Sequence, residues 1–557
     1  MVSATFLRCR ASPSFPLSHR MGEGRGEGRI LKVHFLVAMP VISTMIPPMN
    51  TPTQQAFNQG AARANASYQA ARRNITIDPI TRLEGHGKID IFLNDQGNVD
   101  RAYFQVPELR GFEVFSLGRP AEDMPQITSR ICGVCPTAHH MAATKALDDL
   151  YKIEPTSAGR KIRELVYNTF TLEDHALHVF VLGGPDFIVG PEAPPELRNI
   201  VGVIQKVGLE AGKKVIGTRK RLRELIAYFG GKVVHPVLGL PGGVSKALKP
   251  EDLPAFKQLA KDGVEFAEWT LAVFKQIVLG NPDYVKLITS DDYTHKTCYM
   301  GMVDDKNKVS FYDGKLRVVD CNGQEVCKFT AQQYREFVAE HVEPWSYMKF
   351  SFLKPRGWKG FNEGPDTSIY SVGPLARLNA ADGMATPKAQ AAYEELYKTL
   401  GGKPVHHTLA NHWARVIEMI QAAERIEQLL NDPEITSPDV RRVPTSIPKE
   451  GMGVVEAPRG TLFHHYQTDE RGCITMANMV VATGNNAARI AMSVERAAKG
   501  LIKDGKVTEG LLNKIEMAFR AYDPCLGCAT HSLPGHLPMV VKIYDPQRQL
   551  VQELVRD

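Results

Sequence analysis

The sequence of 557 residues contains no run of 18 or more uninterrupted apolar residues, the length that a membrane-spanning helix requires. The nearest candidate, 33–49, is interrupted by three prolines. For a secretory signal peptide, this segment lies too far from the first residue, and no obvious cleavage site follows it. We therefore expect neither a membrane span nor a signal peptide.

Net charge is also nearly absent once the first 73 residues are set aside. These residues hold nine Lys or Arg and two Asp or Glu, whereas the rest holds 58 and 59. A near-neutral remainder gives no indication of nucleic-acid binding. The segment 1–73 is rich in Gly, Pro, Ser, Ala and Arg, so we expect a disordered basic extension. It could equally be sequence upstream of a wrongly chosen start, with Met45 or Met49 as the more natural beginning.

Cysteine is scarce, since nine in this length cannot form a disulfide scaffold. Four of them form two Cys-x-x-Cys pairs, Cys132/Cys135 and Cys525/Cys528. Cys321 and Cys327 flank an Asn-Gly turn, and we expect them to be lone packed thiols rather than a disulfide. We expect the same of Cys298 and Cys473. This usage suits a reducing cytoplasm in which thiolates serve metals.

Neither an internal repeat nor a βαβ alternation is present. Apolar residues at a spacing of three or four predict long helices, at about 157–182, 208–228, 254–279 and 416–430. Alternation in 88–93 and 99–106 predicts a β-hairpin, and Asn-Gly and Asp-Gly turns predict a small meander within 308–329. The expected fold class is α+β and mainly helical, with a large helical core and small β appendages.

The two Cys-x-x-Cys pairs can offer four thiolates to one metal site. Taken alone, such pairs favour structural zinc. Thiolates suit zinc, iron–sulfur clusters and nickel almost equally, so the ligand type does not choose between them. A zinc ribbon, however, keeps its pairs within a few tens of residues, and here they lie about 390 positions apart. That separation favours a site at the centre of a large core.

The residues around the pairs form longer motifs. They are Arg130-Ile-Cys-Gly-Val-Cys-Pro-Thr-Ala-His139, Asp523-Pro-Cys-Leu-Gly-Cys-Ala-Thr-His531, Asp78-Pro-Ile-Thr-Arg-Leu-Glu-Gly-His86, Arg110-Gly-Phe-Glu113, His235-Pro236 with Pro241-Gly-Gly243, and Ala457-Pro-Arg-Gly460. In order and separation, these motifs resemble those of the [NiFe] hydrogenase large subunit. The resemblance runs from about Ile75 to the C-terminus.

The resemblance implies the [NiFe]-hydrogenase large-subunit fold and reversible heterolytic cleavage of H₂. Residues 74–531 would form the catalytic domain. Cys132 and Cys525 would be terminal nickel ligands, and Cys135 and Cys528 would bridge nickel to an iron that carries CO and cyanide. Cys525 would accept the first proton and Glu84 would carry it onward, because a buried carboxyl can have a pKa near neutral.

Further roles follow from the same resemblance. Arg459 would lie over the iron and face one cyanide, Thr483 would donate to the other, and His139 would donate to a bridging sulfur. Glu113 and His531 would hold Mg²⁺. Asp174, His175 and His178, at helical spacing in a segment that the family shares, are expected to be structural or to support the ligands. Pro136-Thr137 and Ala482-Thr483-Gly484 depart from the usual pattern and are typical of the cytoplasmic branch.

The resemblance also implies partners. Because the chain has no further cysteine cluster, an iron–sulfur small subunit would take the electrons. An acceptor module for NAD(P), a deazaflavin or a heterodisulfide reductase would follow. A maturation endopeptidase would cut after His531 and release 532–557. The alternatives are a cofactor-less relative, such as the subunit of the quinone-reducing NADH dehydrogenase, and a structural zinc scaffold. The first lacks the four cysteines that this chain has.

Overall fold

The fold is described from a computed structural model. It describes residues 74–445, 449–530, 539–544 and 550–556, the last two segments by their backbone alone. The extension 1–73 lies wholly outside these residues. Of the predicted peptide 532–557, only the two segments 539–544 and 550–556 are described. Among the helices in the described part, none combines the length and apolarity needed to cross a membrane.

The N-terminal sheet contains the predicted hairpin and one further strand. Strands β1 (Asn74–Ile77), β2 (Lys88–Leu93) and β3 (Val99–Gln105) pair antiparallel in the order β1-β2-β3. Ile89 and Phe104 are fully buried and form one apolar cluster with residues of α16 (Ala487–Leu501). One face of the sheet therefore packs on this helix.

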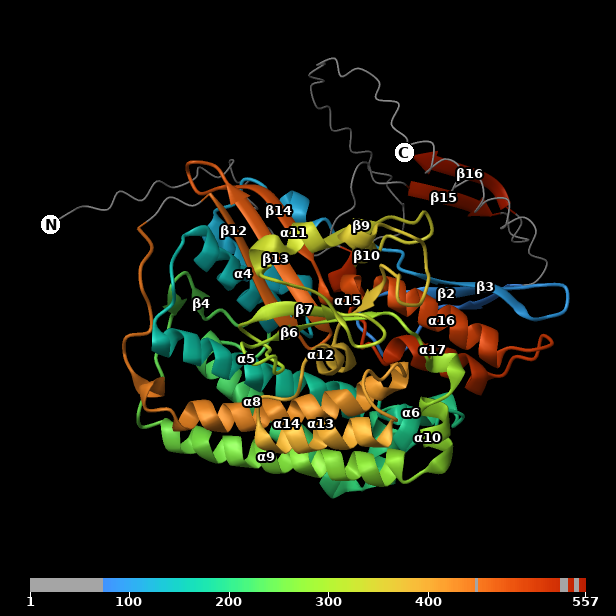
Figure 1. The fold of residues 1–557 in the computed structure, drawn as a ribbon, viewed down its shortest axis with the longest axis horizontal. Helices are drawn as coiled ribbons and strands as arrows, with labels where there is room; N and C mark the ends of the chain where they lie inside the picture. The colour runs from blue at the N-terminus through green and yellow to red at the C-terminus, as the bar shows by residue number, and fades with distance from the viewer. Residues whose placement is uncertain (1–73, 446–448, 531–538, 545–549, 557) are drawn as a thin grey trace, which may run out of the picture. The chain divides into compact units, whose positions relative to one another are not determined.

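Four long helices form the predicted helical core: α5 (Ser157–Leu177), α8 (Leu209–Gly230), α9 (Leu253–Phe274) and α14 (Asn411–Asn431). Helix α14 packs against both α5 and α9, and α5 packs against α8 (Figure 1). α5 and α9 each continue into one π-helical turn, His178–Leu182 and Lys275–Leu279. α14 is buried over most of its circumference, as expected of a central helix.

The predicted meander is part of a four-stranded sheet. Strands β6 (Cys298–Val303), β7 (Lys315–Val319) and β8 (Glu325–Phe329) run antiparallel, and β11 (Tyr370–Ser371) pairs parallel with β6. The loop 304–314 and the Asn-Gly turn at 322–323 connect the three antiparallel strands, as the sequence predicts.

A second antiparallel sheet, which the sequence analysis did not predict, lies inside the core. It consists of β12 (Glu450–Ala457), β13 (Gly460–Thr468) and β14 (Ile474–Val480). Helix α4 (Pro136–Leu150) lies directly on it. A Cβ at Gly451 or Gly453 would come within 2.2 Å of α4 backbone atoms. Glycine at these positions thus permits the close approach of strand and helix.

Shorter elements complete the chain. The helices are α2 (Phe112–Phe115), α3 (Met124–Thr128), α6 (Pro185–Ile188), α7 (Ile200–Val207), α10 (Pro282–Ile288), α11 (Tyr334–Phe337), α12 (Pro374–Ala380), α13 (Pro387–Thr399), α15 (Ala482–Asn485), α17 (Glu509–Arg520) and α18 (Leu526–Ala529). The strands are β4 (Gly239–Leu240), β5 (Gly243–Val244), β9 (Val338–His341), β10 (Phe350–Leu353), β15 (Met539–Tyr544) and β16 (Leu550–Arg556). β15 pairs antiparallel with β16.

Candidate metal centre

The fold brings the two Cys-x-x-Cys pairs together. Cys132 and Cys135 lie in the turn that begins α4, and Cys525 and Cys528 lie in the turn of α18. The four sulfur atoms all lie within 4.8 Å of one another. The Sγ–Sγ distances are 3.2 Å for Cys132–Cys525, 2.9 Å for Cys525–Cys528 and 3.7 Å for Cys135–Cys528. Each residue is at most 5% exposed, so the four thiols form one buried site.

The thiols differ in how readily they ionise. Burial opposes ionisation of Cys132, but hydrogen bonds from the three other thiols and the charge of Arg459 lower its pKa well below the usual value. Burial, together with these same hydrogen bonds to Cys132, raises the pKa of Cys525 and Cys528. Four buried thiolates therefore require added cations. A soft divalent metal fits this all-sulfur donor set.

Arg110 connects the two cysteine turns. Its NH1 group donates to the carbonyl of Ile131, just before Cys132, at 2.5 Å. The same group donates at 3.2 Å to the carbonyl of Gly527, between Cys525 and Cys528. In the sequence Arg110 stands out only as part of a motif, because nothing local indicates which carbonyls its guanidinium reaches.

Glu84 lies directly against Cys525. The two residues form a parallel β-bridge, in which Leu526 N–H donates to the Glu84 carbonyl at 2.8 Å. The Glu84 Oε2 atom accepts hydrogen bonds from Cys525 Sγ at 2.9 Å and from Gly527 N–H at 3.0 Å. Burial and the nearby Cys132 raise the pKa of Glu84, although the Cys525 hydrogen bond opposes the shift. The predicted pair of thiol and carboxyl is thus in hydrogen-bond contact.

The next residue shows how tightly this segment is packed. Gly85 has φ +89°, and a Cβ there would lie 2.7 Å from the backbone nitrogen of Gly527. Only glycine meets both conditions without displacing the cysteine turn.

Arg459 is buried between two carboxylates. Its NH1 lies 3.1 Å from Asp174 Oδ2, and its NH2 lies 2.9 Å from Asp523 Oδ2. His178 Nδ1 pairs with the other Asp523 oxygen at 3.2 Å. Burial disfavours the charge of Asp523, but Arg459 and His178 lower its pKa. Burial raises the pKa of Asp174 to about 7, against the attraction of Arg459.

The sequence patterns alone did not identify Asp523 as a partner of Arg459. Its place two residues before Cys525 was the available signal. Asp174 and His178 were expected to be structural or to support the ligands, and both lie in this charged group beside the cysteines.

Thr483 and His139 occupy different surroundings. The Thr483 hydroxyl oxygen accepts a hydrogen bond from the backbone N–H of Cys525 at 3.0 Å. His139 is fully buried on α4, and its Nδ1 lies 3.1 Å from Nε2 of His464, which in turn bonds Tyr466. Thr483 therefore lies at the cysteine turn, whereas the described bond of His139 is to another histidine.

The remaining predicted residues do not all fall within the described structure. Glu113 is 5% exposed, and its Oε1 accepts a long bond of 3.4 Å from the Met479 N–H. His531 lies outside the described residues. Cys298, Cys321 and Cys327 form no disulfide within the described residues, as expected of lone thiols, and Cys473 is buried.

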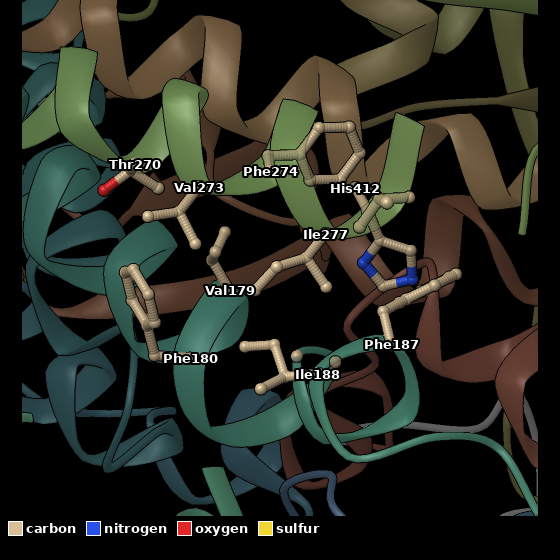
Figure 2. A pocket seen from close by; sticks show the side chains of 12 residues that line it. Val179, Phe180, Phe187, Ile188, Thr270, Val273, Phe274, Ile277 and His412 are labelled. Carbon is tan, nitrogen blue, oxygen red and sulfur yellow. The ribbon is translucent and has the colours of Figure 1, made fainter. Parts of the chain in front are cut away.

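A small apolar cavity lies near this charged group (Figure 2). It has a volume of about 30 Å³ and is lined mainly by aliphatic and aromatic side chains. Phe180 and Ile277 come from the π-helical turns that follow α5 and α9, and Phe187 comes from α6. His412 contributes the one imidazole, and its ring stacks on His178 with centroids 5.3 Å apart. Because its lining is almost entirely apolar, the cavity offers few of the polar partners that an ordered water needs.

Two sequence families match the chain. One, described as "HoxL-like", matches residues 74–109, and the other, described as "Nickel-dependent hydrogenase", matches 110–193 and 273–531. Among curated relatives, an F420-non-reducing hydrogenase iron-sulfur subunit of Archaeoglobus profundus is 48% identical over 86% of this chain and 99% of its own. The NAD-reducing hydrogenase HoxS subunit beta of Cupriavidus necator is 37% identical over 87% of this chain and 100% of its own.

Solved structures agree. The structure of an NAD⁺-reducing [NiFe]-hydrogenase in the H₂-reduced state matches with a TM-score of 0.78 and 37% identity, over 83% of this chain and 100% of that one. The Ni-Fe-Se hydrogenase of D. vulgaris Hildenborough matches with a TM-score of 0.66 and 26% identity, over 82% of this chain and 100% of that one. These matches cover nearly the whole of each relative and confirm the fold class. The chain belongs to the nickel-dependent hydrogenase large-subunit family and has the fold of the [NiFe] hydrogenase large subunit.

Proposed function

We propose that this chain catalyses the reversible heterolytic cleavage of H₂ into two protons and two electrons. The observation that carries the proposal is the hydrogen bond between Cys525 and Glu84 within a buried set of four thiols. A purely structural metal site has no need of a carboxyl group in contact with a ligand sulfur. A catalytic site needs a proton acceptor at that position.

In this proposal Cys132, Cys135, Cys525 and Cys528 would together hold the nickel–iron centre through their sulfur atoms. When bound, the centre would supply a Lewis-acidic, electron-rich position at which H₂ is polarised. The protein moves the proton. Cys525 Sγ accepts it and passes it over 2.9 Å to Glu84 Oε2, and Gly527 N–H holds that oxygen in place.

The surrounding residues hold the rest of the centre. Arg459, a buried cation kept in place by Asp174 and Asp523, would face one cyanide on the iron. Thr483, whose oxygen accepts from Cys525 N–H, retains a hydroxyl proton for the second cyanide. His139 would donate to a bridging sulfur. Glu113 and His531 would bind Mg²⁺.

The electrons must leave through another polypeptide, since the sequence offers no further Cys-x-x-Cys pair. An iron–sulfur small subunit is the proposed partner, followed by an acceptor module for NAD(P), a deazaflavin or a heterodisulfide reductase. The relatives named above include F420-non-reducing and NAD-reducing enzymes. We further propose a cytoplasmic location and removal of 532–557 by a maturation endopeptidase.

A cofactor-less relative is not supported, because all four cysteines are present and converge. Metal analysis of the purified complex distinguishes a hydrogenase centre from a structural zinc site. We expect nickel and iron in near-equal amounts, and zinc alone would overturn the proposal.

Glu84→Gln tests the proton path. This variant should keep both metals but slow H₂ turnover and H₂/D⁺ exchange together, by roughly 10²- to 10⁴-fold for loss of a general acid–base group. Glu108→Gln is the matched control, since the Glu108 carboxylate bonds His86 at the edge of the same segment. Exchange at the wild-type rate in Glu84→Gln would require another carrier.

A further inference from the structure

Asp186 lies at the centre of a buried group of charged residues. It is on α6, is 1% exposed, and accepts hydrogen bonds on both oxygens. Oδ1 accepts from Arg82 NH2 at 2.5 Å and from Asn513 Nδ2 at 3.1 Å, and Oδ2 accepts from Arg520 NH1 at 2.7 Å. One carboxylate thus binds two arginines from segments far apart in the chain.

Each arginine lies close in sequence to one residue of the thiol–carboxyl pair. Arg82 is two residues before Glu84, and Arg520 ends α17 five residues before Cys525. Glu84 and Cys525 are the two residues in contact at the metal centre. Asp186 therefore binds the segment that precedes Glu84 and the segment that precedes Cys525, the two residues of the β-bridge.

The segment before Glu84 depends on this anchor. Arg82 has φ +57°, a left-handed conformation that a non-glycine residue adopts only when its surroundings impose it. Its guanidinium also donates to the Leu182 carbonyl at 3.1 Å and to Asn513 Oδ1 at 2.9 Å. The preceding Thr81 hydroxyl donates to Glu516 at 2.6 Å, and Glu516 pairs with Arg520. Every side-chain bond named here ties this segment to α17 or to the neighbourhood of α6.

We propose that Asp186 is a positioning residue that sets the distance between Glu84 and Cys525. This inference rests on the proposed role of Glu84 as proton carrier. Proton transfer is steeply sensitive to distance, and a misplacement of about 1 Å can cost roughly 10²-fold in rate. Asp186 touches neither group, so its effect passes through the backbone at Arg82 and Arg520.

Asp186→Asn is the direct test, because asparagine keeps the shape but removes the charge that holds two arginines. We expect nickel and iron contents to be retained and H₂/D⁺ exchange to fall about 10- to 100-fold. Asp148→Asn is the matched control. Asp148 also holds a buried arginine, with Oδ2 at 2.5 Å from Arg163, but its carboxylate contacts Gly242 and not the segment of Glu84. Exchange activity should change little in this control.

A second measurement can be made on protein that contains no metal. Amide hydrogen exchange followed by mass spectrometry should show faster exchange for 81–87 in metal-free Asp186→Asn, but not in Asp148→Asn. If Asp186→Asn fails to fold, Arg82→Lys serves as a second variant. Lysine keeps the positive charge but lacks the planar guanidinium that donates to several acceptors at once. Arg82→Lys should show the same local exchange and the same rate loss. Unchanged protection of 81–87 in both variants would overturn the proposal.

The double variant Glu84→Gln/Asp186→Asn separates positioning from general damage. If Asp186 acts through Glu84, the double variant is no slower than Glu84→Gln alone. If the two losses multiply, Asp186 acts elsewhere and the positioning role fails, while the role of Glu84 stands. If Glu84→Gln exchanges at the wild-type rate, the proton-carrier role itself fails, and the positioning proposal fails with it.

Discussion

Cys525 and Glu84 are 441 positions apart in the chain, yet the thiol of one donates to the carboxyl oxygen of the other at 2.9 Å. The contact is set by backbone as well as side chains, because the two residues form a β-bridge and Leu526 N–H donates to the Glu84 carbonyl. The fold thus holds the proposed metal ligand against its proposed proton acceptor.

The four thiols should be necessary for metal retention. Cys132→Ala or Cys525→Ala should abolish nickel retention and H₂ activity, because each removes one donor from a set whose sulfurs all lie within 4.8 Å. Cys327→Ala, a free thiol on β8, is the control and should retain both. Metal content by mass spectrometry and H₂ uptake with a dye acceptor provide the measurements. Native nickel content in either ligand variant would contradict the assignment.

Removing the buried cation should destabilise the protein. Arg459→Met leaves Asp174 and Asp523 buried together without their shared partner, which costs on the order of 3–5 kcal/mol. Adding Asp174→Asn should restore part of this loss, because one of the two like charges is removed. Urea unfolding of metal-free protein gives the free energies. A double variant less stable than Arg459→Met would show that repulsion between the carboxylates is not the cause.

Stability should fall in weakly acidic solution because neutral histidines are buried. His140 Nε2 accepts from the N–H groups of Leu238 and Gly239, so it cannot take a proton without losing both bonds. Burial lowers the pKa of His140 from 6.5 to about 4. As pH falls below 6.5, the unfolded chain binds a proton that the folded chain excludes, so the free energy of unfolding decreases until about pH 4.

His140→Gln should remove this contribution. The slope of the unfolding free energy against pH between 6 and 4.5 should decrease by about 1.2 kcal/mol per pH unit relative to wild type, because the unfolded and folded chains differ by slightly less than one proton over this range. Denaturant titrations at several pH values measure it. An unchanged slope would mean that His140 does not contribute.

The C-terminal peptide should act as a latch during metal insertion. Cys528 lies only three residues before His531, so a chain that continues past His531 would hold this segment open. We expect mature enzyme to end at His531, and a gene truncated there to yield chain without a properly loaded nickel site. Intact-mass measurement of active enzyme is decisive, since a C-terminus at Asp557 would exclude the latch.

Local patterns predicted the elements whose burial is one-sided or that have clear turns. The hairpin of β2 and β3 alternates because its inner side chains pack on α16, and α8 and α9 show their helical spacing because each buries one face against a neighbouring helix. The sheet of β12–β14 was missed because nearly all of β12 and most of β13 are buried on both faces. Such strands lose the period of two, and Gly451 and Gly453 look like breaks rather than contact points for α4.

The sequence by itself determined the chemistry of the centre. The two Cys-x-x-Cys pairs and the motifs around them indicate thiolate ligation and the family. Both depend on residue type and on short spacings along the chain, which the sequence shows directly. Only the tertiary structure decided which distant groups meet. Arg110 joins the two cysteine turns, Asp174 and Asp523 share Arg459, and Asp186 binds Arg82 and Arg520. Each pairing connects segments tens to hundreds of residues apart, and packing of the helices, not any local pattern, determines which of many buried charges become partners.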